Sequence, residues 1–222
     1  QVRFLRRHCD LQVLVPTPWF PLPFFPRWSA HRKLPNREHL DGIEVRRPRY
    51  ITLPRRILFS QVWRSYLAAI DRASDPGADI VHAHCAYPDG YAAAAFGRKN
   101  GIPVVITVHG HDIKLLPQAH PRWRQLIVEA LGEASAVIAV SEDLASRVRE
   151  LGISGHKIHV IPNGIDGELF QPDLTRVPGV GGWHLVFVGR FDPAKGIGDL
   201  LAAFAGVRRR IPDARLTLVG GN

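Results

Sequence analysis

Short apolar runs alternate with longer amphipathic stretches along most of the chain. The runs at 79–84, 104–108 and 136–140 are rich in β-branched or small apolar residues and lack the spacing of a helical stripe. This pattern is typical of strands buried on both faces of a parallel sheet. Shorter apolar runs at 11–15 and 158–161 predict two further strands.

Helical periodicity fills the intervals between these runs. Val62, Trp63, Leu67 and Ile70 recur at helical spacing within 60–73, and we interpret this stripe as core packing. The other predicted helical segments are the end of a helix at 3–8, an alanine-rich helix capped by Asp89 and ended by Gly101, a helix over 122–131, and a helix from a Ser141 cap to Gly152. Strands that alternate with helices predict an α/β fold with a Rossmann-like, doubly wound parallel sheet.

The pattern breaks between 171 and 182, where prolines and glycines interrupt a polar stretch without periodicity. We place a domain linker there, between an N-terminal domain at 1–170 and the start of a second domain at 183–222. The second part predicts a strand, a helix and a strand, at 185–188, 199–210 and 216–219. We expect this first β-α-β of a second Rossmann-like domain to be too small to bury a core by itself.

A proline-rich segment at 16–28 follows the first predicted strand. Its five prolines alternate with aromatic residues, and because proline removes a backbone donor, the segment is predicted to be an irregular loop. The aromatic side chains either pack inward or form an interfacial wedge beside Arg27, Arg32 and Lys33. After a turn and short strand at 41–45, the basic run at 46–56 matches no nucleic-acid-binding module, so we expect no nucleic-acid partner.

The composition of the chain indicates which kinds of partner and which cell compartment to expect. The chain has 222 residues, 45% of them hydrophobic, with 29 Lys and Arg against 20 Asp and Glu. This charge favours anionic partners, such as a phosphorylated substrate or an acidic membrane surface. The cysteines, Cys9 and Cys85, have no CxxC spacing, which favours a reducing, cytoplasmic location. No apolar run is long enough to cross a bilayer, so membrane contact is expected to be peripheral.

The strand at 104–108 turns abruptly polar at its end, in His109-Gly110-His111-Asp112. Ligands of open α/β sheets bind beyond the carboxyl ends of the strands. His109 is therefore a candidate catalytic residue, or a hydrogen-bonded structural histidine. Gly110 and Asp112 are candidate lining residues, since Gly110 would let a ligand or loop approach the main chain.

A second candidate site follows the strand at 185–188. Gly189 opens a loop that carries Arg190 and Lys195 and leads into a helix. Two cations on such a loop can close on a diphosphate, with the helix N-terminus adding its own positive end. The alternative is a basic surface loop. The chain has neither a Walker A loop nor GxGxxG, so no nicotinamide cofactor is expected.

A metal-dependent hydrolase is a contrasting hypothesis. His82 and His84 end the neighbouring strand, and with His109, His111 and Asp112 they offer ligands that suit zinc. Against it, the ligands have no HExxH or other compact spacing, and we do not expect the imidazoles along one strand to converge on one face.

Several segments together resemble the GT-B glycosyltransferases of the large retaining family 4, and the resemblance covers essentially the whole chain. The matching segments are Val81-His82-Ala83-His84 with Ala86-Tyr87-Pro88-Asp89-Gly90, Thr107 through Asp112, Val140-Ser141, Ile161-Pro162-Asn163-Gly164-Ile165-Asp166, and Phe187-Val188-Gly189-Arg190 through Lys195-Gly196. The stretches 13–21 and 48–50 further resemble the teichuronic-acid type of polysaccharide glycosyltransferase within that family.

The resemblance implies a two-domain enzyme that transfers a sugar from a nucleotide-diphosphate sugar to a glycan or lipid-linked acceptor, with retention. By similarity, Arg190 and Lys195 would bind the donor diphosphate, His109 would face the donor sugar, and Asn163 and Gly189 would line the site. No cofactor and no divalent metal is implied. We expect the enzyme in the cytoplasm or peripherally on the inner face of the membrane.

The chain also departs from the family pattern. The family's first strand with its glycine-rich loop, and its ExxxxxxxE segment, are absent from these residues. We therefore expect the 222-residue polypeptide to be a catalytically incomplete piece of a transferase, with weak or no donor turnover. A non-catalytic membrane- or acceptor-docking module and a sugar-nucleotide epimerase are the remaining alternatives, although no acid/base carboxylates for an epimerase are identified.

Overall fold

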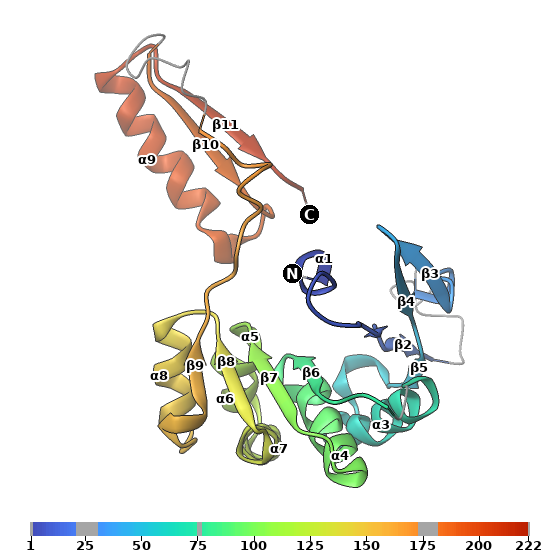
Figure 1. The fold of residues 1–222 in the computed structure, drawn as a ribbon. Coiled ribbons are helices and arrows are strands. Elements are labelled where there is room, and N and C mark those ends of the chain that lie inside the picture. Colours follow the sequence, from blue (N-terminus) through green and yellow to red (C-terminus); the bar gives the residue numbers. More distant parts are fainter. Residues whose placement is uncertain (1, 21–30, 75–76, 173–181, 222) are drawn as a thin grey trace. The chain divides into compact units, whose positions relative to one another are not determined.

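A computed structural model of the chain describes residues 2–20, 31–74, 77–172 and 182–221. The chain forms two compact units, residues 1–164 and 165–222, which are drawn in Figure 1. Most of the predicted linker at 171–182 lies outside the described residues. None of the helices in the described part of the chain has both the length and the apolar character that a bilayer-spanning helix needs.

A four-stranded parallel sheet forms the centre of the first unit. Its strands follow the order of the sequence: β6 (Val81–His84), β7 (Val104–Val108), β8 (Ala136–Ala139) and β9 (Ile158–Val160). All three pairings are parallel. The four runs predicted as buried strands therefore pair side by side, and the α/β class with a Rossmann-like parallel sheet is confirmed.

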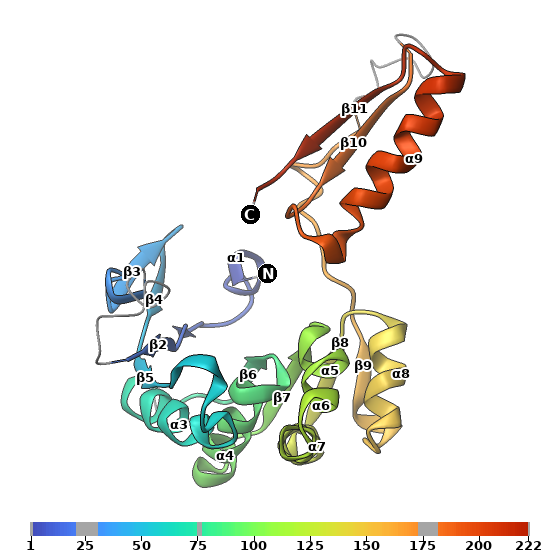
Figure 2. The same cartoon turned by 180° about the vertical axis from the view of Figure 1, so that it is seen from behind.

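Helices connect successive strands of this sheet. They are α4 (Tyr91–Asn100), α7 (Pro121–Glu133) and α8 (Glu142–Glu150). Figures 1 and 2 place α8 beside β9 and α4 at the β6 end, next to α3 (Val62–Ala73). Their apolar faces and the strands bury one continuous core, in which Ile106, Leu126 and Val137 are fully enclosed. The hydrophobic stripe of α3 is core packing, as predicted: Val62 and Trp63 pack in this core, and Leu67 and Ile70 pack in a smaller second cluster.

The helix ends agree with their sequence signals in most cases. Ser141 caps α8 through its hydroxyl, which accepts a hydrogen bond from Leu144 N at 3.3 Å. Gly101 ends α4 with left-handed backbone. The predicted cap of α4 is wrong, because no side chain caps that helix. The Asp89 carboxylate instead accepts a hydrogen bond from the hydroxyl of Tyr66 on α3.

The N-terminal part of the first unit forms small sheets. After α1 (Val2–Leu5), β1 (Val13–Leu14) pairs with β4 (Ile43–Arg46), which also pairs with β3 (Arg37–Leu40). A separate two-stranded sheet joins β2 (Thr17–Trp19) to β5 (Arg49–Ile51).

The predicted irregular loop at 16–28 is wrong at β2 and lies outside the described residues from 21 to 28. Thr17 N donates to Pro48 O, and Thr52 N donates to Trp19 O. Because alternate residues of a parallel strand face the partner, the missing N–H of Pro18 breaks no ladder bond.

Several short elements were not predicted. Two single-turn helices, α5 (His111–Lys114) and α6 (Leu116–Ala119), follow β7. The 3-10 and π turns are η1 (Pro54–Arg56), η2 (Phe59–Gln61), η3 (Ala86–Gly90), η4 (Gly155–Lys157) and η5 (Pro193–Lys195). Segment 161–166 after β9 is irregular.

The second unit contains β10 (His184–Val188), η5, α9 (Ile197–Arg210) and β11 (Arg215–Val219), as expected of a β-α-β unit. The strands pair in parallel with Leu185 beside Leu216 and Phe187 beside Leu218. Among the described residues of this unit, Ala214 alone is buried, and Val186 and Val188 are 59% and 74% exposed. The unit thus has almost no core of its own, in agreement with the expectation from its size.

Candidate functional site

Three imidazoles lie in a row at the carboxyl edge of β6 and β7. The rings of His82 and His84 stack with centroids 4.6 Å apart, and those of His84 and His109 lie 5.2 Å apart at 22°. His84 Nδ1 is 2.9 Å from His109 Nε2. His82 Nε2 is 2.7 Å from the hydroxyl oxygen of Thr107. Each of these nitrogen contacts is one hydrogen bond, so the tautomers of His84 and His109 are linked.

This arrangement corrects the expectation that the imidazoles of one strand do not converge. His82 and His84 are two residues apart in β6, so their side chains share a face of the sheet. The register then brings them to β7, where His84 is paired with Thr107 and His82 with Val105. This two-residue spacing was the signal that would have predicted His82 and His84 on one face.

The two histidines of β6 are held in the neutral form. Burial lowers the pKa of His82 and of His84 below the usual value for histidine. The neighbouring imidazoles lower both pKa values further, because a second positive charge in the row is unfavourable. Near neutral pH His82 and His84 therefore offer nitrogen donors and acceptors rather than positive charge.

Asp112 is buried and binds backbone rather than lining an open site. Its side chain accepts hydrogen bonds from His109 N at 3.1 Å, from Gly110 N at 2.9 Å and from Ala86 N at 2.9 Å. One carboxylate thus joins the segment after β7 to the segment after β6. Asp112 acts on the site through the main chain that carries His109.

Gly110 is required for its backbone conformation. It has φ of 121° as the residue before α5, which side chains rarely adopt. A Cβ at this position would meet no atom within 4 Å, so a close approach by another part of the described chain is not the reason for glycine. Together, Gly110 and Asp112 turn the chain sharply after His109.

Further partly buried polar groups lie next to the row. Burial raises the pKa of the Cys85 thiol to about 12, and the carboxylates of Asp112 and Asp89 raise it further. Cys85 is therefore not a reactive thiolate near neutral pH. Burial also raises the pKa of Asp89, against the opposing effect of the hydrogen bond from Tyr66. Sequence reasoning missed the pair of Tyr66 and Asp89, which no local motif connects.

The geometry does not support the metal-dependent hydrolase. Among the described residues, no three His, Cys, Asp or Glu side chains are arranged to hold a metal ion. One nitrogen of each imidazole bonds within the row or to Thr107, and Asp112 is occupied by backbone N–H groups. His111 is exposed in the first turn of α5.

The loop after β10 carries the predicted cations. Gly189 N donates to Val219 O at 2.9 Å, which holds the loop against the end of β11. The Arg190 side chain is 75% exposed, and its guanidinium lies 4.0 Å from the Asp192 carboxylate. Lys195 ends η5, directly before Gly196 and α9. Both cations thus lie on the short connection between a strand end and a helix N-terminus.

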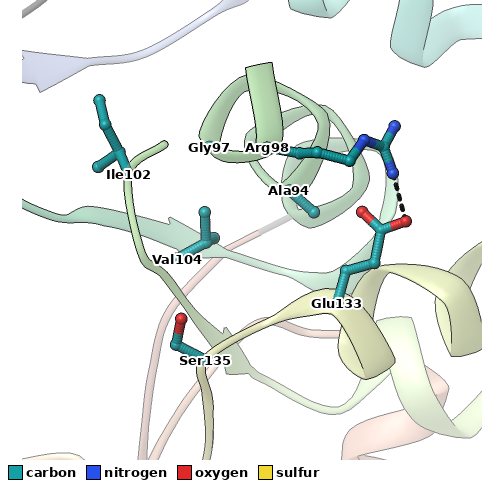
Figure 3. A pocket seen from close by; sticks show the side chains of 7 residues that line it. All are labelled: Ala94, Gly97, Arg98, Ile102, Val104, Glu133 and Ser135. Atoms are coloured by element: carbon teal, nitrogen blue, oxygen red, sulfur yellow. Dashed lines mark hydrogen bonds and ion pairs between the residues drawn. The ribbon is translucent and has the colours of Figure 1, made fainter. Parts of the chain in front are cut away.

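A shallow hollow of about 340 Å³ opens on this loop, lined by Arg190, Phe191, Asp192 and Pro193. Another hollow, of about 300 Å³, lies where the Arg98–Glu133 ion pair bridges α4 and α7 (Figure 3). Its lining includes Val104 and Ser135, at the amino ends of β7 and β8. Ligands of parallel sheets bind at the opposite edge, so we do not treat this second hollow as the site.

Asn163 is exposed in the irregular segment after β9. It belongs to the first unit, and it follows a strand that is separated from β7 by β8. A role for Asn163 in lining the site stays a prediction.

A parallel α/β sheet with polar side chains at its carboxyl edge, followed by a strand, a basic loop and a helix, defines a Rossmann-like ligand-binding protein. The chain belongs to Glycosyltransferase Family 4, whose sequence signature matches residues 2–169.

Curated relatives agree with this family. TuaC of Bacillus subtilis, assigned to teichuronic acid biosynthesis as a glycosyltransferase, is 33% identical over 168 residues, which cover 73% of this chain and 43% of TuaC. Glycogen synthase of Mycobacterium tuberculosis is 33% identical over 163 residues, covering 68% of this chain and 37% of the synthase. The chain thus spans less than half the length of these relatives.

Solved structures share the fold. Sucrose-phosphate synthase from Thermosynechococcus elongatus has a TM-score of 0.61 at 23% identity, over 86% of this chain and 50% of that chain. HepE of Anabaena, in complex with UDP and glucose, has a TM-score of 0.59 at 20% identity, over 81% of this chain and 48% of that chain. At these identities the likeness concerns the fold, and it confirms the predicted GT-B class.

Proposed function

We propose that this chain is part of a retaining glycosyltransferase that moves a hexose from a nucleotide-diphosphate sugar to a glycan or lipid-linked acceptor. The observation that carries the proposal is the basic strand-to-helix loop of residues 189–196 in a chain of Glycosyltransferase Family 4. We place the enzyme in the cytoplasm, with no nucleic-acid partner, no cofactor and no metal requirement.

The donor diphosphate would bind at Arg190 and Lys195. Both side chains extend from a loop that is tied to β11 and leads into the 14-residue helix α9. The N-terminus of a helix this long attracts anions, and a guanidinium can bind two phosphate oxygens at once. In the reaction, these cations would offset the charge that develops on the leaving nucleoside diphosphate.

His109, at one end of the imidazole row, would contact the donor sugar. His84 holds the Nε2 side of its ring, and Asp112 holds its backbone N–H. A ring fixed in this way can present Nδ1 to a hydroxyl of the sugar without first being reoriented. We therefore assign His109 as the catalytic-site histidine, with His84 and Asp112 as positioning residues.

The named ligands of related proteins support a nucleotide-sugar donor. HepE of Anabaena has been solved with UDP and with UDP-glucose. A mannosyltransferase of Mycolicibacterium smegmatis, 25% identical over 208 residues, is named as GDP-mannose-dependent and acts on a phosphatidylinositol mannoside. UDP-glucose and GDP-mannose are accordingly the first donors to test.

The proposal is tested by titrating the ¹⁵N-labelled chain with UDP-glucose and GDP-mannose, and with the nucleoside diphosphates UDP and GDP. We expect the amide signals of residues 189–196 to move with one donor. Arg190→Gln and Lys195→Gln each remove one diphosphate contact and should weaken binding about tenfold. Asp192→Asn removes a competing negative charge while its amide oxygen still caps η5, and should strengthen binding a few-fold.

Arg209→Gln is the matched control, because Arg209 lies in the last turn of α9, away from the loop. It should leave the affinity unchanged. Loss of affinity in Arg209→Gln equal to that in Arg190→Gln would reduce the effect to net charge and contradict a diphosphate site. A chain that binds no nucleoside diphosphate, or binds it equally well as Arg190→Gln, would also contradict the proposal.

A further inference from the structure

The turn between β5 and α3 presents two exposed aliphatic side chains. Ile57 and Leu58 are 57% and 61% exposed. The next residue, Phe59, packs against the core instead, with its ring 5.2 Å from that of Tyr87 and 5.0 Å from that of Trp123. The Tyr87 hydroxyl also donates a hydrogen bond to Phe59 O. Aromatic packing around Phe59 therefore holds the turn against the core, while Ile57 and Leu58 at its tip remain exposed to solvent.

The backbone of this turn is strained. Arg55, Arg56 and Leu58 have φ of 55°, 59° and 53°, in the left-handed region that residues other than glycine, asparagine and aspartate seldom adopt. Arginine and leucine side chains make this backbone conformation unfavourable, so we look for a function that requires them at these positions. Strained segments that persist are a reason to look for a function at that place.

Basic side chains flank the tip. Between residues 45 and 70 the sequence has six arginines, of which Arg46 and Arg47 pair with Glu44 and Glu38. Arg56 lies over the rings of Phe59 and Trp123, both at 5.6 Å, and Arg64 lies 5.1 Å from the ring of Trp63. In the described part of the chain, no carboxylate pairs with Arg55, Arg56 or Arg64.

We propose that residues 55–58, with Arg64, form a docking turn for an anionic lipid surface. Ile57 and Leu58 enter the headgroup layer, and Arg55, Arg56 and Arg64 bind lipid phosphates. An apolar tip flanked by arginines that have no carboxylate partner in the described part of the chain is complementary to a bilayer, which offers apolar chains below a layer of negative charge. A free phosphate would use the arginines and leave the aliphatic pair exposed.

The position of the docking turn has a consequence that rests on the proposed function. Tyr87, which holds Phe59, belongs to η3, and η3 directly follows the end of β6 where His84 lies. The docking turn is therefore attached to the carboxyl edge of the sheet, on the same side as the imidazole row. A lipid-linked acceptor in that surface would be presented to the same edge as His109.

The test is co-sedimentation of the chain with vesicles of phosphatidylglycerol and phosphatidylcholine, and with vesicles of phosphatidylcholine alone. We expect binding to the anionic vesicles that falls steeply between low and high salt. Ile57→Asn with Leu58→Asn should weaken binding about tenfold or more, since asparagine tolerates left-handed backbone but has no apolar contact to offer. Arg55→Gln with Arg64→Gln should weaken it about fivefold for each arginine.

Ile165→Asn with Leu169→Asn is the matched control. Ile165 and Leu169 are 77% and 73% exposed in the second unit, beside the acidic residues Asp166 and Glu168. This pair should leave vesicle binding within twofold of the unaltered chain. Circular dichroism of each variant establishes that the fold is retained, and Leu58→Asn alone serves if the double variant does not fold.

The inference is overturned if the chain does not bind anionic vesicles, if it binds neutral vesicles equally well, or if the variants at 57 and 58 bind as the unaltered chain does. If the control pair weakens vesicle binding as strongly as the tip variants do, exposed apolar side chains in general, and not the docking turn, are responsible for the binding. Donor binding plays no part in this assay. Failure of the nucleotide-sugar titration therefore does not contradict the docking turn. Failure of the vesicle assay likewise does not contradict donor binding.

Discussion

Asp112 sets the position of two strand ends through one buried carboxylate. An Asp112→Asn variant keeps one oxygen but turns an NH₂ group toward at least one of the three backbone N–H donors. A buried donor left without an acceptor costs about 2–3 kcal/mol. We expect the free energy of unfolding, measured with urea, to fall by about that amount. Asp79→Asn, at an exposed carboxylate, should leave it nearly unchanged.

The same variant should also move the imidazole row. If Asp112 positions His109, ¹⁵N signals of the His84 and His109 rings will show a changed tautomer ratio in Asp112→Asn. A loss of stability with unchanged ring signals would assign Asp112 a structural role and remove it from the positioning of His109.

The row of histidines makes stability depend on pH. The folded-state pKa values of His82 and His84 lie below those of the unfolded chain. On acidification the unfolded chain therefore takes up protons first. Stability from these groups is complete above about pH 6.5 and is lost as the pH falls through the lower folded-state values.

We expect His82→Gln to reduce the difference in unfolding free energy between pH 7.5 and pH 5.5 relative to the unaltered chain. Comparison with a variant is needed, because the raised pKa of Asp89 acts in the opposite direction on acidification. His159→Gln is the control, since His159 is exposed on β9. An unchanged pH dependence in His82→Gln would contradict neutral burial of this side chain.

At the scale of the elements, α4 lies unusually close to β7. A Cβ on Gly97 would lie 2.3 Å from a methyl group of Val104 and 2.5 Å from Ile102 O. Gly97→Ala should therefore destabilise the protein by about 1–3 kcal/mol, although alanine is the better helix former. Gly132→Ala in α7 meets no atom within 4 Å, and should stabilise by about 0.5–1 kcal/mol.

Urea unfolding of the two glycine variants is a paired measurement, because both changes add one methyl group to a helix. Opposite signs are expected. Equal effects would mean that α4 can shift away from β7 at little cost, and that the close contact does not fix the helix on the sheet.

The elements differ in how much of them sequence could predict. The strands β7 and β8 were predictable because burial on both faces demands a nearly continuous apolar run, while β6 and β9 keep apolar residues at alternate positions. By contrast, β3 (Arg37–Leu40) is a polar edge strand whose pairing with β4 leaves no periodic signal. The single turns α5 and α6 are too short to show one. An element that buries little surface needs no regular spacing of apolar residues. The sequence therefore does not reveal such elements, and they are found only in the structure.

The candidate site follows the same rule. His109, Arg190 and Lys195 were predicted because strand ends mark the reactive edge of such a sheet. The contact between His84 and His109 joins residues 25 positions apart. The Asp112 carboxylate binds Ala86, 26 positions away, as well as Gly110 in its own turn. Such contacts depend on the strand register, which no local motif specifies.

At the scale of the whole molecule, the two units differ in buried surface. The first encloses a core that includes Ile106 and Val108, both 0% exposed, while the strands of the second leave Val186 and Val188 largely exposed. Because local opening is resisted chiefly by buried apolar contacts, the second unit should open far more often than the first.

Hydrogen exchange followed by mass spectrometry measures this difference in the intact chain. The amides of β10 and β11 that bond across this strand pair should exchange at least about a hundredfold faster than those of β7, which bond within the four-stranded sheet. The edge strand β3 is the internal control: it lies in the first unit but is largely exposed, so it should exchange quickly too. Equal protection of β7 and β10 would mean that the second unit is held by contacts beyond its own β-α-β, and that burial within each unit does not set its stability.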